Sequence, residues 1–232
     1  VKDADTAGNA IATALAKVLR RAPNAEAPKA IACCIEFAAS AASFQDGLIY
    51  ERKAFLDLMN GEQSQALRHL FFAEKAAVKI PNLAQDLPLR KIELVGIIGA
   101  GTMGSGIAMN FLNAGMPVTL LEVAKDALDR GIEHIRRTFA SNVEKGRITQ
   151  AQMDIRMGLL SGSTNYADLA DRDLVIEAVF ENRTLKAKVT KVAEAAMDQT
   201  GVFASNTSTL PITELAKASG RQDQFIGIHF FS

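Results

Sequence analysis

A glycine-rich turn between an apolar run and a helical stretch constrains the fold of this chain more than any other feature. Residues 94–98 read as a buried strand, and the sequence GAGTMG follows directly at 99–104. A helical stretch with few breakers comes next, and a second β-rich run over 118–121 ends at Glu122. A strand, a glycine turn, a helix and a strand, with an acid about twenty residues beyond the turn, predict a βαβ unit that binds a dinucleotide.

Each residue of this turn has a physical role in holding the cofactor. Gly99 allows the tight turn, Gly101 lets the backbone approach a pyrophosphate, and Gly104 lets the helix pack closely on the sheet. The N-terminus of the helix favours phosphate. Glu122 would accept both ribose hydroxyls and repel a 2′-phosphate, so we expect NAD rather than NADP. The alternative is a glycine turn that merely joins a strand to a helix, but the flanking elements and the acid favour the cofactor site.

Strands and helices alternate through the rest of this region. Strands are expected over 174–179, 202–205 and 225–230, and helices over 124–144, 186–197 and 212–219. Residues 148–169 are less regular and predict a short helix and a strand crossing 157–161. This alternation indicates an α/β fold, a Rossmann-type doubly wound parallel sheet. Its ligands should meet the carboxyl ends of the strands near the topological switch point.

The first part of the chain predicts only helices. They are expected before Pro23 and over 28–42, 44–59 and 63–79, and a polar, proline-bearing linker follows over 82–90. We therefore expect two domains: an all-helical segment over 1–90 and the dinucleotide-binding domain over 91–232. The chain begins at Val1 rather than Met and both ends look cut, so we expect a piece of a longer protein.

Composition excludes several classes of function. Lys plus Arg and Asp plus Glu both number 26, so no charge excess predicts a nucleic-acid or membrane-surface partner. No apolar run is long enough to span a bilayer, and no spacing of Cys and His predicts a metal site. The adjacent Cys33 and Cys34 are expected as free, buried thiols, which favours a reducing compartment. We expect the bacterial cytoplasm, with an organelle as the open alternative.

Polar residues stand at four of the expected strand ends: Glu122, Glu181 with Lys186, the run over 205–208, and His229. Taken singly, the acid and the hydroxyl residues are more often helix starts and N-caps, and the histidine a core residue bonded to a backbone carbonyl. Beside a cofactor motif, we favour His229 as a general base that faces the nicotinamide. His69 and His134 lie on charged helices and are expected at the surface.

Four ordered motifs, GAGTMGSGIA, DLVIEAVFEN, FASNTSTLPITELA and IGIHFFS, resemble the NAD domain of 3-hydroxyacyl-CoA dehydrogenases over residues 92–232. The stretch FQDGLIYERKAFLDLMNGEQSQALRHLFFAEKAA resembles the helical end of the enoyl-CoA hydratase part, with the linker helix, of multifunctional fatty acid oxidation proteins. The resemblance implies a fragment of a fused hydratase and dehydrogenase. Such a parent oxidises (3S)-3-hydroxyacyl-CoA to 3-ketoacyl-CoA with NAD in fatty acid β-oxidation.

The resemblance also implies roles for individual residues. His229 would take the proton of the 3-hydroxyl group, and Ser208 would contact cofactor and substrate oxygen. The expected cofactor contacts are Gly99, Gly101, Met103, Gly104, Glu122, Val179, Phe180, Glu181, Lys186, Ser208 and Ser232. The glutamate that orients the histidine and the helical domain that closes over the substrate are expected beyond Ser232, and the hydratase acids before Val1. The chain alone is therefore expected to bind NAD at most.

Other functions stay open. One alternative is another NAD-linked hydroxyacid dehydrogenase with the same fold, and a second is a non-catalytic module that holds NAD and joins a hydratase to a thiolase. The expected partners of the parent are the acyl-CoA substrate, a thiolase subunit and further copies of itself.

Overall fold

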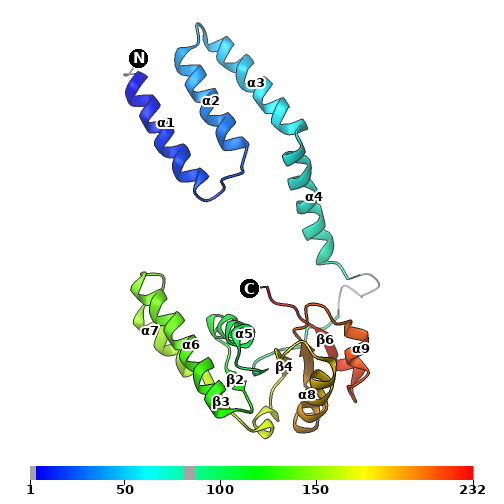
Figure 1. Cartoon of the computed structure of the whole chain (residues 1–232). Helices are drawn as coiled ribbons and strands as arrows, with labels where there is room; N and C mark the ends of the chain where they lie inside the picture. Colours follow the sequence, from blue (N-terminus) through cyan, green and yellow to red (C-terminus); the bar gives the residue numbers. More distant parts are fainter. Residues whose placement is uncertain (1–3, 81–86, 232) are drawn as a thin grey trace. The chain divides into compact units, whose positions relative to one another are not determined.

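The computed structural model describes residues 4–80 and 87–231, which fall into two compact units (Figure 1). The boundary between the units lies between Leu87 and Pro88 in the sequence. No helix in the described residues is both long and apolar enough to span a membrane.

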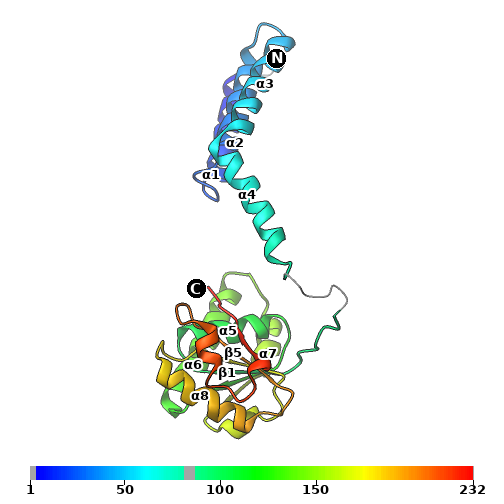
Figure 2. The same ribbon diagram turned by 90° about the vertical axis from the view of Figure 1, so that its right-hand side faces the viewer.

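The described residues of the first unit form four helices. They are α1 (Ala4–Leu19), α2 (Ala27–Ser40), α3 (Phe44–Asn60) and α4 (Glu62–Ala77). Neighbouring helices α1, α2 and α3 lie side by side, and α4 continues from α3 after Gly61 (Figures 1 and 2). The predicted helical segment is confirmed, with helix ends within about two residues of those expected.

Few side chains in this unit are buried. Among residues 8–80, Ala32 is the one fully buried side chain. The rings of Phe37 and Tyr50 stack with centroids 4.3 Å apart and join α2 to α3. The expectation of buried thiols is wrong, because Cys33 is exposed and Cys34 is only partly buried. Four helices in a nearly single layer leave too little interior to enclose both faces of α2.

The second unit is a six-stranded sheet. Its strands are β1 (Val95–Ile98), β2 (Val118–Leu121), β3 (Leu160–Ser163), β4 (Leu174–Glu177), β5 (Val202–Ser205) and β6 (Phe225–Gly227). They lie in the order β3-β2-β1-β4-β5-β6 and all pairs are parallel. The chain starts at β1, builds outward to β3 and then returns to the other side of β1. This is the doubly wound order with its switch point between β1 and β4, so the predicted Rossmann-type fold is confirmed.

Helices cover both faces of the sheet. One face carries α5 (Thr102–Asn113), α6 (Lys125–Glu144) and α7 (Gln150–Gly158), and the other carries α8 (Arg183–Ala196) and α9 (Ile212–Ala216) (Figures 1 and 2). Two short 3₁₀ turns precede strands in the sequence: η1 (Tyr166–Leu169) before β4 and η2 (Gln222–Gln224) before β6. Alternate residues of the strands enter opposite cores: Val95 and Ile97 pack with α5 and α6, whereas Ile98 packs with α8. All four residues of β1, β2 and β4 are buried, as expected of strands covered on both faces.

Three strands differ from the prediction. β4 ends at Glu177 rather than at residue 179. β3 occupies 160–163 rather than 157–161, because α7 continues to Gly158 from a capping box at Thr149 and Gln152. β6 ends at Gly227 rather than at residue 230. Beyond it the N–H of Phe230 donates to the side chain of Asn206 instead of to a strand.

Candidate cofactor-binding site

The glycine turn joins β1 to α5 at the switch point of the sheet. Gly99 has a φ of 104°, which L side chains rarely adopt. A Cβ at Gly104 would lie 1.8 Å from the carbonyl oxygen of Gly99, so the helix can approach the turn only without a side chain there. A Cβ at Gly101 would meet nothing within 4 Å. Gly99 and Gly104 are therefore required by the turn itself, whereas Gly101 leaves open space beside the start of the helix.

The start of α5 is free to bind an anion. Gly101 stands at its N-cap position and provides no side chain for the first N–H groups. Met103 is partly buried in the first turn. Unsatisfied N–H groups and the positive end of the helix dipole favour a phosphate at this position. The open space at Gly101 lies where such a group would need it, so these residues fit the pyrophosphate of a dinucleotide.

A second glycine approach was missed from the sequence. A Cβ at Gly131, in the middle of α6, would lie 2.6 Å from the carbonyl oxygen of Ala100. Helix α6 therefore packs directly on the glycine turn and supports it from behind. A glycine inside an otherwise amphipathic helical pattern is itself a signal of close packing, so this contact could have been expected.

Glu122 lies beside the turn, at the end of β2. Its carboxylate accepts a hydrogen bond of 3.2 Å from the N–H of Ala100, 22 residues earlier, and a longer one from Ala124. The side chain is partly buried. Burial raises the pKa of the neighbouring Tyr166, and the charge of Glu122 raises it further. One half of the sheet thus brings a carboxylate and the glycine turn together, an arrangement that fits the adenosine half of a dinucleotide.

The other half of the sheet carries polar groups at the ends of β4 and β5. Glu177, the last residue of β4, is fully buried, and its two oxygens lie 2.9 and 3.0 Å from Nζ of Lys186 in α8. The hydroxyl of Ser205 and the N–H of Val179 also donate to this carboxylate. The side chain of Lys186, which is predicted to contact the cofactor, is 2 % exposed and contacts the carbonyl oxygen of Val179 in the loop after β4. An acid within an apolar strand was the available signal for this cluster.

Glu181 joins the loop after β4 to the loop after β5. One carboxylate oxygen accepts from the hydroxyl groups of Thr207 and Thr209 and from the N–H groups of Ser208 and Thr209. The other lies 3.3 Å from Nζ of Lys186. Burial raises the pKa of Glu181, but the hydrogen bonds from both threonines and the charge of Lys186 outweigh it and lower the pKa to about 2. Glu181 is therefore a carboxylate that holds two loops together.

Asn206 positions the segment that carries His229. Its side-chain oxygen accepts a hydrogen bond of 2.8 Å from the N–H of Phe230, and the N–H of Ile228 donates to Ser205. His229 is exposed, which excludes the interpretation as a core histidine, and its ring contacts that of Phe231 with centroids 4.6 Å apart. Thr207, the residue after Asn206, donates its hydroxyl hydrogen bond to Glu181. The hydrogen bonds of Glu181 and those of Asn206 therefore meet in the loop after β5.

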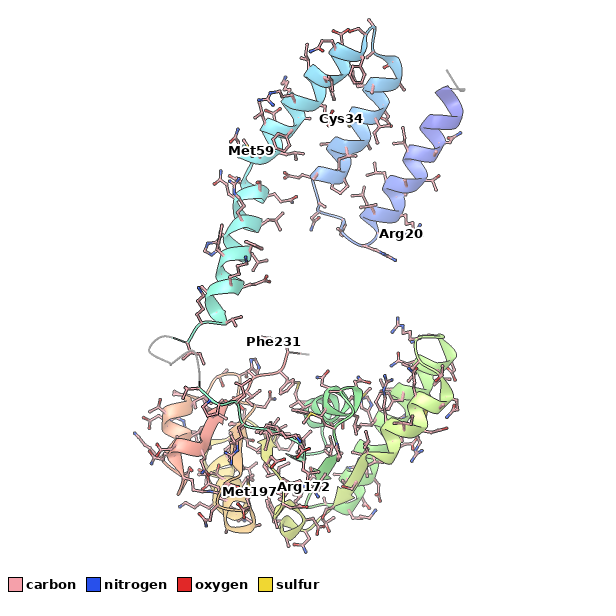
Figure 3. All side chains as sticks on the ribbon, turned by 180° about the vertical axis from the view of Figure 1, so that it is seen from behind. Arg20, Cys34, Met59, Arg172, Met197 and Phe231 are labelled. Atoms are coloured by element: carbon pink, nitrogen blue, oxygen red, sulfur yellow. The ribbon has the colours of Figure 1, made fainter. Side chains whose placement is uncertain are left out.

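The remaining predicted residues lie around this edge. Val179 is partly buried and packs on the core beneath, whereas Phe180 and Ser208 are exposed. Figure 3 shows Phe231 at the opposite end of the sheet from Arg172 and Met197, which precede β4 and β5. Ser232, also predicted as a cofactor contact, lies outside the described residues.

The other two histidines and the possible metal ligands do not indicate a second site in the described residues. His69 and His134 are exposed, so their predicted surface positions are confirmed. Within residues 4–80 and 87–231 there is no group of three or more His, Cys, Asp or Glu side chains that could hold a metal ion.

Comparison with known proteins identifies relatives of this arrangement. The sequence model of the protein family described as "3-hydroxyacyl-CoA dehydrogenase, NAD binding domain" matches residues 94–232 of this chain. The chain is 36 % identical over 220 residues to the peroxisomal fatty acid beta-oxidation multifunctional protein MFP2 of Arabidopsis thaliana, covering 94 % of this chain and 30 % of that protein. The crystal structure of (S)-3-hydroxybutyryl-CoA dehydrogenase from Ralstonia eutropha is similar with a TM-score of 0.60 and 38 % identity, over 61 % of this chain and 50 % of that one. The chain thus spans less than a third of the plant relative.

Proposed function

The chain belongs to the 3-hydroxyacyl-CoA dehydrogenase family, and on that premise we propose that it supplies the NAD-binding domain of an enzyme that oxidises (3S)-3-hydroxyacyl-CoA to 3-ketoacyl-CoA. The match to a plant multifunctional protein extends over both units of the chain, which supports a parent that also carries an enoyl-CoA hydratase part in fatty acid β-oxidation. By itself the chain is proposed to bind NAD without turnover.

One observation carries this proposal. The carboxyl edge of the sheet holds the glycine turn with Glu122 in one half, and in the other half the segments of Ser208 and His229 joined through Asn206. A dinucleotide spans the two halves of such a sheet, so its reactive ring would lie over β4 and β5.

The proposed roles follow from this placement. Bound NAD would accept the hydride that leaves C3 of the substrate. His229 takes the proton of the 3-hydroxyl group on its exposed imidazole, so that one proton and one hydride leave together and a carbonyl forms. We propose that the nicotinamide side is lined by Ser208, Val179, Phe180 and Glu181, with Lys186 nearby. The pyrophosphate and the adenosine are proposed to lie against Gly99, Gly101, Met103, Gly104 and Glu122.

Calorimetric titration of this chain with NAD and with NADP tests the cofactor site. We expect binding of NAD, weaker or no binding of NADP, and loss of that preference in Glu122→Ala, because the carboxylate that accepts the ribose hydroxyls and repels a 2′-phosphate is then gone. Glu144→Ala removes an exposed carboxylate at the end of α6 and is the matched control. Equal binding of both cofactors by the unmodified chain would refute the assignment.

Turnover is tested in the full-length parent with 3-hydroxybutyryl-CoA and NAD. His229→Ala should lower the rate by about 10²- to 10⁴-fold, the usual range for a general base, while His134→Ala should not change it. A faster reaction with a hydroxyacid that lacks CoA would favour the alternative dehydrogenase. No reduction of NAD by the parent would favour the non-catalytic module that joins a hydratase to a thiolase.

We also propose partners and a cellular location for the parent protein. The acyl-CoA substrate is supported by the family, and a thiolase subunit and an oligomeric parent are further proposals. The two free cysteines support a reducing compartment, for which we propose the bacterial cytoplasm. The plant relative is named for the peroxisome, so an organelle is the alternative. Fractionation of cells that express the tagged parent would distinguish the two.

A further inference from the structure

The segment that follows β6 holds His229 between two anchored neighbours. The side chains of Ile228 and Phe230 are partly buried and pack on the core that α5 and α6 share with the sheet, whereas His229 is exposed. Side chains of an extended segment alternate between its two faces, so the inward positions of Ile228 and Phe230 direct His229 outward. The direction of His229 is therefore set by its two neighbours.

Both neighbours are also held through their backbone. The N–H of Ile228 donates to the carbonyl oxygen of Ser205 at 3.0 Å, and the N–H of Phe230 donates to the side-chain oxygen of Asn206 at 2.8 Å. The first bond continues the ladder between β5 and β6, but at Phe230 a side chain takes the place of the strand. Asn206 is 8 % exposed, and its own N–H donates to the carbonyl oxygen of Glu177 in β4. The acceptor is thus itself fixed to the sheet.

A ring from α5 also holds this segment. The ring centroids of Phe111 and Phe230 lie 6.2 Å apart with an interplanar angle of 60°, which is an edge-to-face contact. Phe111 belongs to the helix that follows the glycine turn, and Asn206 to the loop after β5. Two elements far apart in the chain thus fix Phe230, one through its ring and the other through its N–H.

These anchors matter because a general base acts only within hydrogen-bond reach of the proton that it takes. The proton and the hydride leave one carbon together, so a displacement of the base by a fraction of an ångström lowers the rate of the chemical step. Binding of the cofactor does not depend on the exact place of the imidazole in the same way. Loss of an anchor should therefore affect turnover more than affinity.

We propose that Asn206 and Phe111 are positioning residues that hold the backbone beside His229 and thereby place its imidazole for proton transfer. This inference rests on the proposed dehydrogenase function, in which His229 takes the proton of the 3-hydroxyl group. It assigns a role in the chemical step to a helix residue, Phe111, that lies outside the cofactor motif and the polar strand ends.

Steady-state kinetics of the full-length parent with 3-hydroxybutyryl-CoA and NAD tests the proposal. Asn206→Ala removes the acceptor, and Phe111→Ala removes the ring without removing that acceptor. We expect each to lower kcat by about tenfold, within the roughly 10²-fold that a misplacement of about 1 Å can cost, with KM changed by less than about twofold. Asn113→Ala truncates an exposed asparagine of the same helix as Phe111 and is the matched control, which should keep both constants.

The same substitutions in a His229→Ala background separate positioning from a general effect on folding. Once the imidazole is gone there is no base to misplace, so Asn206→Ala and Phe111→Ala should lower the residual rate by less than about twofold. Damage to the fold or to the cofactor site would instead reduce both rates alike. In the 232-residue chain, the Phe230 amide should exchange faster in Asn206→Ala than in Phe111→Ala, because only the first removes its acceptor.

Three outcomes in an active parent would overturn the inference: kcat unchanged in both variants, a higher KM without loss of kcat, or the same fold loss with and without His229. If Asn206→Ala does not fold, Phe111→Ala provides the same comparison. A parent that does not reduce NAD would instead refute the proposed function, and the inference with it.

Discussion

A single methyl group should have opposite effects at two glycines of the same helix. In α5, a Cβ at Gly104 would lie 1.8 Å from the carbonyl oxygen of Gly99 and 2.9 Å from its carbon, whereas a Cβ at Gly106 meets nothing within 4 Å. Ordinary contact begins near 3.4 Å, so Gly104→Ala must move this carbonyl by roughly 1.6 Å.

The turn has little freedom to move. Gly99 donates to Leu121 at 2.8 Å, and its neighbour Ile98 accepts from Ala178 at 2.8 Å, so the carbonyl is held between two strands. Overpacking of this kind costs about 1–3 kcal/mol and a strained hydrogen bond about 1 kcal/mol more. The helix gains about 1 kcal/mol when alanine replaces glycine. We therefore expect Gly104→Ala to destabilise by about 1–3 kcal/mol and Gly106→Ala to stabilise by about 1 kcal/mol.

Thermal unfolding measures this contrast. At about 2–4 °C per kcal/mol for a unit of this size, the melting temperature should fall by about 2–12 °C in Gly104→Ala and rise by about 2–4 °C in Gly106→Ala. Hydrogen exchange in β1 and β4 assigns the transition to the sheet unit rather than to the helices. Melting temperatures within 2 °C of each other for the two variants would refute the argument, because the contact at Gly104 would then be absent in solution.

Three further predictions concern the loops and the helix around the site. Glu181 has a pKa of about 2 against an ordinary value of 4.5, so it contributes stability that is present above pH 4.5 and lost as the pH falls towards 2. The side chain is 35 % exposed, so solvent screening reduces its contribution to the free energy of unfolding to about 1 kcal/mol. Glu181→Gln should be less stable than the unmodified chain by that amount at pH 6 and equally stable near pH 2. Urea unfolding that shows a pH-independent difference would contradict this. Asn206→Ala removes the acceptor of the Phe230 N–H, a loss of about 1 kcal/mol, so this amide should exchange about fivefold faster; an unchanged rate would mean that the bond is not formed. Gly131→Ala places a Cβ 2.6 Å from the Ala100 carbonyl oxygen and should lower both the melting temperature and the affinity for NAD. An unchanged affinity in a calorimetric titration would show that α6 does not support the turn.

The elements that local patterns specify were predicted closely. The strand over 118–121 is found at those residues, and the helix expected over 28–42 occupies Ala27–Ser40. Each depends on a period of apolar residues or on a glycine or proline at its end, and these signals act within a few residues. The last strand was predicted three residues too long because its apolar pattern continues to Phe230. It ends at Gly227 because a side chain from another loop, Asn206, takes the place of a neighbouring strand.

The same distinction explains how far the site could be predicted. Ala100 and Glu122 belong to one βαβ unit, so a motif with a fixed spacing describes their meeting. On the other side, Glu181 meets Thr207 and its neighbours across 26 to 28 residues, and Asn206 meets Phe230 across 24. These pairs depend on which strand ends become neighbours in the folded sheet.

The two halves of the site should therefore respond differently to sequence change. In the half that holds the glycine turn, the proposed binding groups are backbone N–H groups and one carboxylate, and close packing at Gly104 and Gly131 fixes the turn. In the other half, side chains hold loops that carry other side chains: Glu181 holds the backbone of Ser208, and Asn206 holds that of Phe230. Packing tolerates apolar exchange but not added volume, whereas a hydrogen-bonded network tolerates neither a lost charge nor a lost acceptor. Recognition of the nicotinamide ring should accordingly be the more easily separated property of this domain, and binding of the adenosine half the more persistent one.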